Sequence, residues 1–236
     1  MPDIKRFTII TGHYGTGKTN LSINLALDLA ERFAEVTLVD LDVVNPYFRS
    51  SDYTALLERH GVRVVAPTFA GTTLETPSLP AAICGALESP GAVVLDVGGD
   101  DAGATALGRY SKQIEQIDYD MLYVINHYRN LTATPEEAAA LLTEIEAASH
   151  LKATGIANNS HLRTETRLET VLDSAEFARQ TADLLGLPLV CTTVPRLSAD
   201  GISSVPGDPT YVMNAYPIEL YVRFPWEQPA EENGKA

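Results

Sequence analysis

Short apolar runs rich in β-branched residues recur along the chain, and longer segments with helical periodicity lie between them. Runs without polar alternation indicate strands buried on both faces, and the periodic segments indicate helices that cover the sheet. In residues 18–33, for example, leucines recur every four positions. The predicted strands are Phe7–Thr11, Val36–Asp40, Val62–Val65, Ala92–Val97, Met121–Asn126, Ala153–Ala157 and Leu189–Thr193. The predicted helices cover 18–33, 52–60, 101–117, 135–149 and 165–185.

This alternation of strands and helices indicates an α/β fold, a three-layer sandwich with a mainly parallel, twisted sheet and helices on both faces. Pro and Gly gather after Pro195, so 196–215 is expected to be loop. Tyr216–Trp226 is aromatic enough to pack on the body as an edge strand. No repeat or linker divides the chain, which predicts a single domain over 1–226 and an acidic, flexible tail over 227–236.

Charge and composition narrow the classes of partner. The 236 residues include 17 Lys and Arg against 31 Asp and Glu, a net charge of −14. This balance argues against nucleic acid and anionic membranes as partners, since both require a basic surface. Cys84 and Cys191 lie too far apart for a metal knuckle or a disulfide framework. No apolar run has the length of a membrane span or resembles a signal peptide, so we expect a cytoplasmic protein.

The motif that carries chemistry lies between the first predicted strand and its helix. Gly12–Thr19, GHYGTGKT, fits the phosphate-loop pattern GxxxxGK[ST]. Gly15 and Gly17 allow backbone N–H groups to converge on one anion, at the positive end of the helix. Lys18 supplies a cation for the β- and γ-phosphates, and the Thr19 hydroxyl is a ligand for Mg²⁺. The competing interpretation is a tight strand–helix turn without a ligand.

Acidic residues follow two other predicted strands, where a parallel sheet collects functional groups. Asp40 and Asp42 end the second strand in VDLD, and Asp96 begins the sequence DVGG. The spacing from Asp96 to Gly99 places a carboxylate near Mg²⁺ and a glycine near the γ-phosphate, as in nucleotide-sensing switches. The alternative is that one or more of these acids is a solvated loop residue or a helix cap.

Together these motifs resemble the MinD/ParA group of P-loop ATPases, within the CobQ/CobB/MinD/ParA nucleotide-binding domains. That group also contains the nitrogenase iron protein and several metallocentre-assembly ATPases. The resemblance covers about residues 5–200. It implies a Mg²⁺- and ATP-dependent switch that hydrolyses its nucleotide, acts on a protein partner and forms a homodimer.

The resemblance also assigns roles to individual residues. The phosphate-loop residues Gly12, His13, Gly15, Thr16, Gly17, Lys18 and Thr19 would bind nucleotide. Lys18 and Asp42 would be catalytic, with Asp42 orienting the attacking water. Thr19, Asp40 and Asp96 would surround Mg²⁺. Asp42, Asn45 and Gly99 would belong to the switch segments.

Two further positions concern the base. Asn158 matches an asparagine that contacts adenine, and Pro195 belongs to the loop that closes over the base in such proteins. The sequence Asn158–His161, NNSH, lacks the carboxylate that reads guanine in Asn-Lys-x-Asp motifs. ATP is therefore favoured over GTP.

One departure from the family pattern bears on catalysis. Dimers of this type carry KGGxGK[ST], with an early lysine that reaches the partner's nucleotide, whereas this chain has His13 and Tyr14 at those positions. A neutral imidazole does not replace an ammonium group, so nucleotide binding through Lys18 should survive and hydrolysis should be slow. Two alternatives stay open: a small-molecule phosphotransferase or ligase of the dethiobiotin-synthetase type, and a nucleotide-binding scaffold without hydrolysis.

Overall fold

Eight parallel strands form one sheet in the order β3-β2-β4-β1-β5-β6-β7-β8 within the described part of the chain. The structure is a computed structural model that describes residues 1–42, 49–66, 84–85, 87–99, 101–196 and 214–222. The strands are β1 (Phe7–Gly12), β2 (Val36–Leu41), β3 (Val62–Val65), β4 (Ala92–Val97), β5 (Tyr119–Ile125), β6 (Gly155–Asn158), β7 (Leu189–Pro195) and β8 (Ala215–Ile218).

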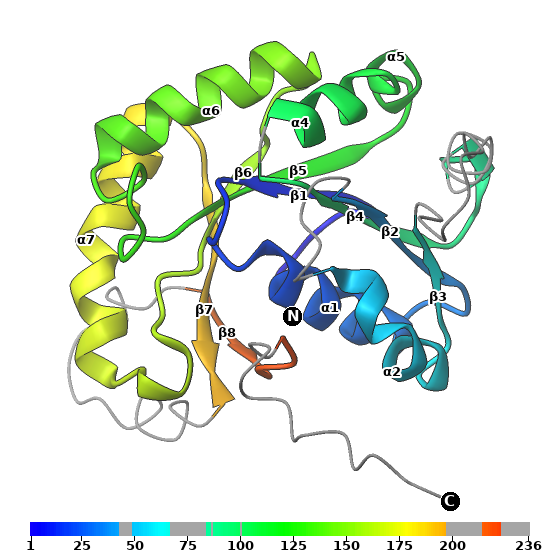
Figure 1. Cartoon of the computed structure of the whole chain (residues 1–236), viewed down its shortest axis with the longest axis horizontal. Helices are drawn as coiled ribbons and strands as arrows, with labels where there is room; N and C mark the ends of the chain where they lie inside the picture. Colours follow the sequence, from blue (N-terminus) through cyan, green and yellow to red (C-terminus); the bar gives the residue numbers. More distant parts are fainter. Residues whose placement is uncertain (43–48, 67–83, 86, 100, 197–213, 223–236) are drawn as a thin grey trace, which may run out of the picture.

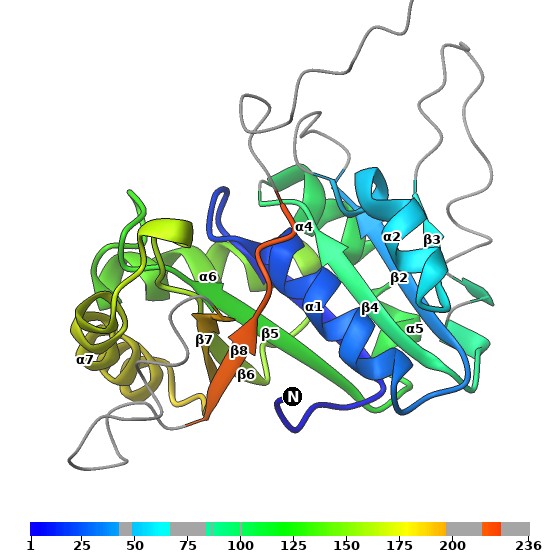
Figure 2. The same cartoon turned by 90° about the horizontal axis from the view of Figure 1, so that it is seen from below.

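Helices cover both faces of this sheet (Figures 1 and 2). One face carries α1 and α2, and the other carries α4 to α7. The α-helices are α1 (Lys18–Ala30), α2 (Thr54–Arg59), α4 (Asp101–Gly108), α5 (Ser111–Ile114), α6 (Pro135–Ser149) and α7 (Leu168–Leu185). Two 3-10 turns, η1 (Ser50–Tyr53) and η2 (Arg163–Glu165), precede α2 and α7.

Alternate side chains of each central strand supply the two cores. In β1, Ile10 packs with Leu21 and Leu25 of α1, whereas Phe7 and Ile9 pack against the opposite helical layer. All these side chains are fully or almost fully buried. The predicted α/β sandwich with a parallel sheet is therefore confirmed, and its apolar strands lie between two helical layers.

Several element boundaries differ from the prediction. The expected helix over 101–117 is two helices, α4 and α5. The first ends at Gly108, which packs closely on α6: a Cβ there would lie 2.7 Å from the carbonyl oxygen of Ala148. The C-terminal strand β8 does lie at the sheet edge, but it is shorter than Tyr216–Trp226. Most of the predicted loop at 196–215 and the predicted tail lie outside the described residues. Within the described residues, no helix is long and apolar enough to cross a membrane.

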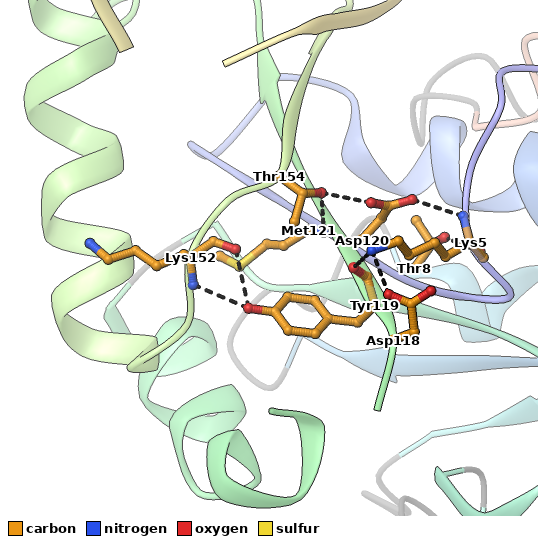
Figure 3. Close-up of polar contacts among 8 residues, drawn as sticks. All are labelled: Lys5, Thr8, Asp118, Tyr119, Asp120, Met121, Lys152 and Thr154. Atoms are coloured by element: carbon orange, nitrogen blue, oxygen red, sulfur yellow. Dashed lines mark hydrogen bonds and ion pairs between the residues drawn. The ribbon is translucent and has the colours of Figure 1, made fainter. Parts of the chain in front are cut away.

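A polar network joins the amino ends of the central strands (Figure 3). The Asp120 carboxylate at the start of β5 accepts hydrogen bonds from the Lys5 backbone N–H at 2.8 Å and from the Thr154 hydroxyl at 2.9 Å. Thr154 also accepts from the backbone N–H of Met121, and Lys5 forms an ion pair with Asp118. This network aligns the segments that lead into β1, β5 and β6. It lies at the amino ends of the strands, whereas the phosphate loop lies at their carboxyl ends.

Candidate nucleotide-binding site

A cavity of about 200 Å³ opens at the carboxyl ends of the strands, beside the start of α1. Its wall combines the phosphate loop with segments that follow β2, β5, β6 and β8. The lining residues are Tyr14, Gly15, Thr16, Gly17, Lys18, Thr19, Asn20, Asp42, Asn126, Arg129, Asn159, His161, Arg163, Leu220 and Val222. The location is the one at which parallel α/β sheets bind ligands.

The phosphate loop is folded onto its own backbone. The His13 carbonyl accepts hydrogen bonds from the Thr16 hydroxyl at 2.9 Å and from Lys18 Nζ at 3.0 Å. Gly17 has φ +87° at the N-cap of α1, a conformation that favours glycine, and a Cβ there would collide with the Asn159 side chain. The glycine pattern thus corresponds to a tightly folded loop, with Lys18 largely buried.

Two carboxylates meet on neighbouring strands next to this loop. Asp40 of β2 and Asp96 of β4 are register partners, and both are buried. Asp40 accepts hydrogen bonds from the backbone N–H groups of Asp42 at 3.0 Å and Ser51 at 3.1 Å. Burial raises the pKa of Asp40, against the opposing effect of the hydrogen bonds from Ser51 and Asp42.

Asp96 is the less satisfied member of the pair. Its Oδ1 accepts a hydrogen bond from the Ser22 hydroxyl at 3.1 Å, whereas its buried Oδ2 has no hydrogen-bond partner in the described part of the chain. Burial and the neighbouring Asp40 raise the pKa of Asp96 to about 7, opposed by Lys18, Thr19 and Ser22. A buried carboxylate pair with an open oxygen is a suitable location for a divalent cation.

The donor set fits Mg²⁺ in particular. Mg²⁺ binds oxygen ligands, and in nucleotide sites it uses one or two carboxylates, phosphate oxygens and water. Asp40, Asp96 and the Thr19 hydroxyl are donors of this kind. No group of three or more His, Cys, Asp or Glu side chains that could hold a metal by itself occurs among the described residues.

Of the two predicted switch segments, the first reaches the cavity wall and the second lies against the phosphate loop. Asp42 lines the cavity and is 8% exposed. A Cβ on Gly99 would lie 2.5 Å from the Tyr14 backbone nitrogen and 2.7 Å from Lys18 Nζ, so only glycine fits between β4 and the phosphate loop. Asn45 lies outside the described residues.

The opposite end of the cavity contains a segment that the sequence analysis did not assign to the site. Asn20 Nδ2 donates to the Glu219 carbonyl at 2.9 Å, and Asn20 Oδ1 accepts from the Tyr221 N–H at 2.9 Å. Asn24, one helical turn later, bonds both the N–H and the carbonyl of Glu219. The sequence signal for this contact was a pair of asparagines four residues apart in α1, and both are buried. They hold residues 219–222 against α1, which places Leu220 in the cavity wall.

Residues after β6 form the rest of this end. Asn159 Nδ2 donates to the Thr16 carbonyl at 2.6 Å, and Asn159 Oδ1 accepts from the Thr193 hydroxyl. His161 Nδ1 accepts from the Arg163 N–H at 3.1 Å, which assigns the ring proton to Nε2. Burial, with Arg163 and Arg129 nearby, lowers the pKa of His161 to about 4, so the ring is neutral near pH 7.

Comparison with known proteins now decides the family. The model of the CobQ/CobB/MinD/ParA nucleotide-binding domain matches residues 7–175, well over half of the chain. The chain belongs to this family. No curated protein sequence matches it.

Solved structures show the same fold at low sequence identity. The cell division protein FtsY of Thermotoga maritima superposes with a TM-score of 0.55 and 21% identity, covering 89% of this chain and 68% of that one. FtsY of Mycoplasma mycoides gives 0.53 and 19%, covering 84% and 64%. The 54 kDa signal recognition particle protein of Aeropyrum pernix, in complex with GDP, gives 0.51 and 19%, covering 81% and 42%. This chain thus spans less than two thirds of the latter two, and the likeness shows the P-loop fold alone.

Within the family pattern, His13 is the main departure. It occupies the position of the signature lysine, and its side chain is partly buried. Burial and the nearby Lys18 ammonium both lower its pKa, so the imidazole is neutral near pH 7. Its backbone carbonyl, rather than its ring, organises the phosphate loop.

The two positions assigned to the base by family resemblance are not in the cavity wall. Asn158 is fully buried, and its amide donates to the Ser174 hydroxyl of α7 at 3.1 Å and accepts from the Ser160 N–H. Pro195 ends β7 beside Ile218, and the residues that follow it, 197–213, are outside the described part. Of the two asparagines, the neighbouring Asn159 is the one that lines the cavity and reaches the phosphate loop.

Proposed function

We propose that the chain binds a purine nucleoside triphosphate with Mg²⁺ and works as a slow nucleotide-dependent switch or assembly ATPase. The observation that supports this most is the convergence of Lys18, Thr19 and Asp42 in one cavity beside the buried Asp40–Asp96 pair. A structural strand–helix turn needs neither a buried lysine nor two adjacent buried carboxylates, and both are costly without a ligand.

Each group has a defined part in this proposal. The loop N–H groups and Lys18 hold the phosphates, and Thr19, Asp40 and Asp96 hold Mg²⁺, which neutralises phosphate charge. Asp42 orients a water that attacks the γ-phosphorus, the bond from that phosphorus to the bridging oxygen breaks, and ADP and phosphate leave. Loss of the γ-phosphate is sensed at Gly99, which lies against Lys18.

For the base, the proposal is ATP ahead of GTP. Reading guanine N1 and N2 requires an acceptor such as a carboxylate, and within the described cavity wall Asp42 is the only acidic residue. Asp42 is assigned to the phosphate end. Asn159 and the apolar Leu220 offer instead an amide and a surface for stacking. The GDP complex of the Aeropyrum protein makes GTP the competitor to test.

A second candidate function is transfer of the γ-phosphate to a small acceptor. A neighbouring cavity of about 250 Å³ shares Arg129, His161 and Arg163 with the nucleotide cavity. Such a cavity offers space and positive charge for an anionic acceptor. Single-turnover ADP formation by the pure protein separates the alternatives. A switch forms ADP slowly by itself, a transferase forms it when an acceptor is added, and a scaffold forms none over hours.

The protein partner and the homodimer are proposals that rest on the family resemblance. In family members with two switch segments, the bound nucleotide changes the surface of these segments. That surface then binds a partner protein or a second subunit. Sedimentation with and without Mg²⁺ and a nonhydrolysable ATP analogue tests the dimer directly, as a nucleotide-dependent rise in mass.

The first prediction concerns Lys18→Ala. We expect it to weaken binding of Mg²⁺·ATP at least about 100-fold, because the phosphates lose their buried cation. Wild-type protein at an ATP concentration 100 times the dissociation constant should gain about 2.7 kcal/mol of stability, and the variant almost none. Calorimetry and thermal melts measure both.

Lys112→Ala, at an exposed position on α5, is the control for charge. Failure of wild-type protein to take up any purine nucleotide would contradict the proposed function. Equal affinities for ATP and GTP would remove only the base assignment.

A further inference from the structure

Arg129, in the loop after β5, lies against the phosphate loop. It lines the nucleotide cavity together with Gly15 and Lys18. Its Nε, Cδ and Cζ atoms are 3.7, 3.8 and 4.0 Å from the point where a Cβ on Gly15 would be. These are ordinary van der Waals separations, so the guanidinium lies within one side-chain contact of the backbone whose N–H groups would face the phosphates.

The loop that carries Arg129 is fixed on both sides of it. Before it, Asn126 Oδ1 accepts from the Tyr128 N–H at 2.9 Å, and the Asn126 carbonyl accepts from the Arg129 N–H at 3.1 Å. After it, the Thr132 hydroxyl donates to the Asn126 carbonyl at 3.0 Å. The Tyr128 hydroxyl ties the same turn to the Thr170 carbonyl of α7 at 2.6 Å. These hydrogen bonds therefore hold the backbone of Arg129 in one position.

The guanidinium of Arg129 has no ion pair or hydrogen bond with any residue that the structure describes. Arg179, for comparison, pairs with Glu176 and Asp183. In a chain with 31 acidic residues, a positioned arginine without a carboxylate beside an anion-binding loop indicates a ligand of negative charge.

Position 13 of the phosphate loop does not supply a second positive charge. His13 stands where family dimers carry the lysine that reaches the partner's nucleotide, and burial and Lys18 keep its pKa low. Lys18 is then the only Lys or Arg within the described phosphate loop, 12–19. A triphosphate with Mg²⁺ still carries excess negative charge, which a second cation stabilises as hydrolysis proceeds.

We propose that Arg129 binds the phosphates of the nucleotide held by its own chain, and so supplies in cis the cation that dimers of this family take from a partner's lysine. This inference rests on the proposed function. An arginine provided by the same chain is an arrangement known in P-loop NTPases. Nucleotide binding and turnover then need no second subunit, and the turnover per chain does not rise with protein concentration.

The first test compares Arg129→Ala and Arg129→Lys with Arg32→Ala, an exposed arginine at the far end of α1 that controls for net charge. Calorimetry with Mg²⁺·ATP and with inorganic tripolyphosphate should show about 10- to 100-fold weaker binding of both ligands to Arg129→Ala. Arg129→Lys should lie between, because it keeps the charge and loses the planar fork. Equal affinities of Arg129→Ala and Arg32→Ala would overturn the proposal. If neither wild type nor Arg32→Ala binds nucleotide, the proposed function itself fails.

The second test separates cis from trans action. A fluorescent ATP analogue is titrated into Arg129→Ala alone and into an equimolar mixture with Lys18→Ala, which keeps its arginine but cannot hold the nucleotide. If the arginine acts in cis, the affinity of the Arg129→Ala sites stays low in the mixture. Recovery of affinity towards the wild-type value would show that the arginine comes from a partner chain and would overturn the cis assignment.

Discussion

The phosphate end and the base end of the cavity are built in different ways. The phosphate end uses one continuous stretch, Gly12–Thr19, and acids on adjacent strands that the sheet register brings together. The base end uses the segment after β6 and residues 219–222, which are far apart in the sequence, and the loop after β5 brings Arg129 to the phosphate loop. One end is set by a local motif and sheet order, and the other by long-range packing.

Their electrostatics differ as well. The phosphate end holds two buried carboxylates beside Lys18, and burial raises the pKa of Asp96 to about 7. The base end holds Arg163 beside His161, whose pKa burial lowers to about 4. The overall charge of −14 reveals neither pattern, since it averages over the surface. The phosphate end thus combines carboxylates for a cation with Lys18 for phosphates, and the base end suits a neutral polar ligand.

The largest effect expected at the phosphate end comes from Gly99→Ala. Its new Cβ would lie 2.5 Å from the Tyr14 nitrogen and must displace the phosphate loop. Overpacking of this kind costs about 1–3 kcal/mol, and we expect nucleotide affinity to fall about 100-fold or more. Calorimetry measures the affinity and circular dichroism the retained fold. Gly85→Ala, where a Cβ would meet nothing within 4 Å, is the matched control and should bind like wild type. Equal binding by both variants would show that Gly99 has no steric role.

Much of the phosphate end could be predicted from the sequence. Asp40 and Asp96 were predicted to end two strands of a parallel sheet, and the structure makes them register partners. The spacing from Asp96 predicted that Gly99 lies near the γ-phosphate; in the structure Gly99 lies against Lys18, and its place beside a phosphate stays a prediction. The parallel α/β fold could also be predicted from the apolar runs, because a buried strand leaves a local pattern in the sequence.

The base end could not be predicted to the same depth. Asn158 and Asn159 are adjacent in the sequence, and only backbone geometry decides that the first faces α7 and the second the phosphate loop. The place of Leu220 depends on Asn20 and Asn24, about 200 residues earlier in the chain. No local pattern reports such a contact. The sequence places Arg129 just after a strand, where it could face the pocket or pair locally, and the structure shows that its loop lies beside Gly15.

A smaller effect on nucleotide binding, together with a pH-dependent effect on stability, is expected from the charge of the phosphate end. An unfolded chain loses the Asp96 proton near its ordinary pKa, 3.8, and the folded chain near 7. Between these values the folded state binds more protons, so this group makes stability fall as pH rises from about 4 to 7. Asp96→Asn removes the effect, and the nucleotide-free variant should be more stable than wild type at pH 8, on the order of 4 kcal/mol.

Denaturant unfolding of wild type and Asp96→Asn at several pH values measures this difference. It should shrink towards zero near pH 4, where both proteins are neutral at this position. The contribution of His161, which has the opposite sign below its ordinary pKa of 6.5, cancels in the comparison. At pH 8 the same variant should lose Mg²⁺-dependent tightening of nucleotide binding. A variant that is less stable than wild type at pH 8 would contradict the buried-charge interpretation.

The smallest effect is expected at the base end, from Leu220→Ala. Leu220 lines the cavity, and truncation removes apolar surface that a purine base would cover, worth about 1 kcal/mol or roughly fivefold in affinity. ATP and GTP should weaken together, because an apolar wall does not distinguish their edges. Inorganic tripolyphosphate, which has no base, should bind as to wild type. Leu184→Ala, at a leucine that is 55% exposed on α7, is the control. A loss of tripolyphosphate affinity would mean that Leu220 supports the phosphate loop, and the two ends of the cavity would then form one cooperative structure rather than two separable halves.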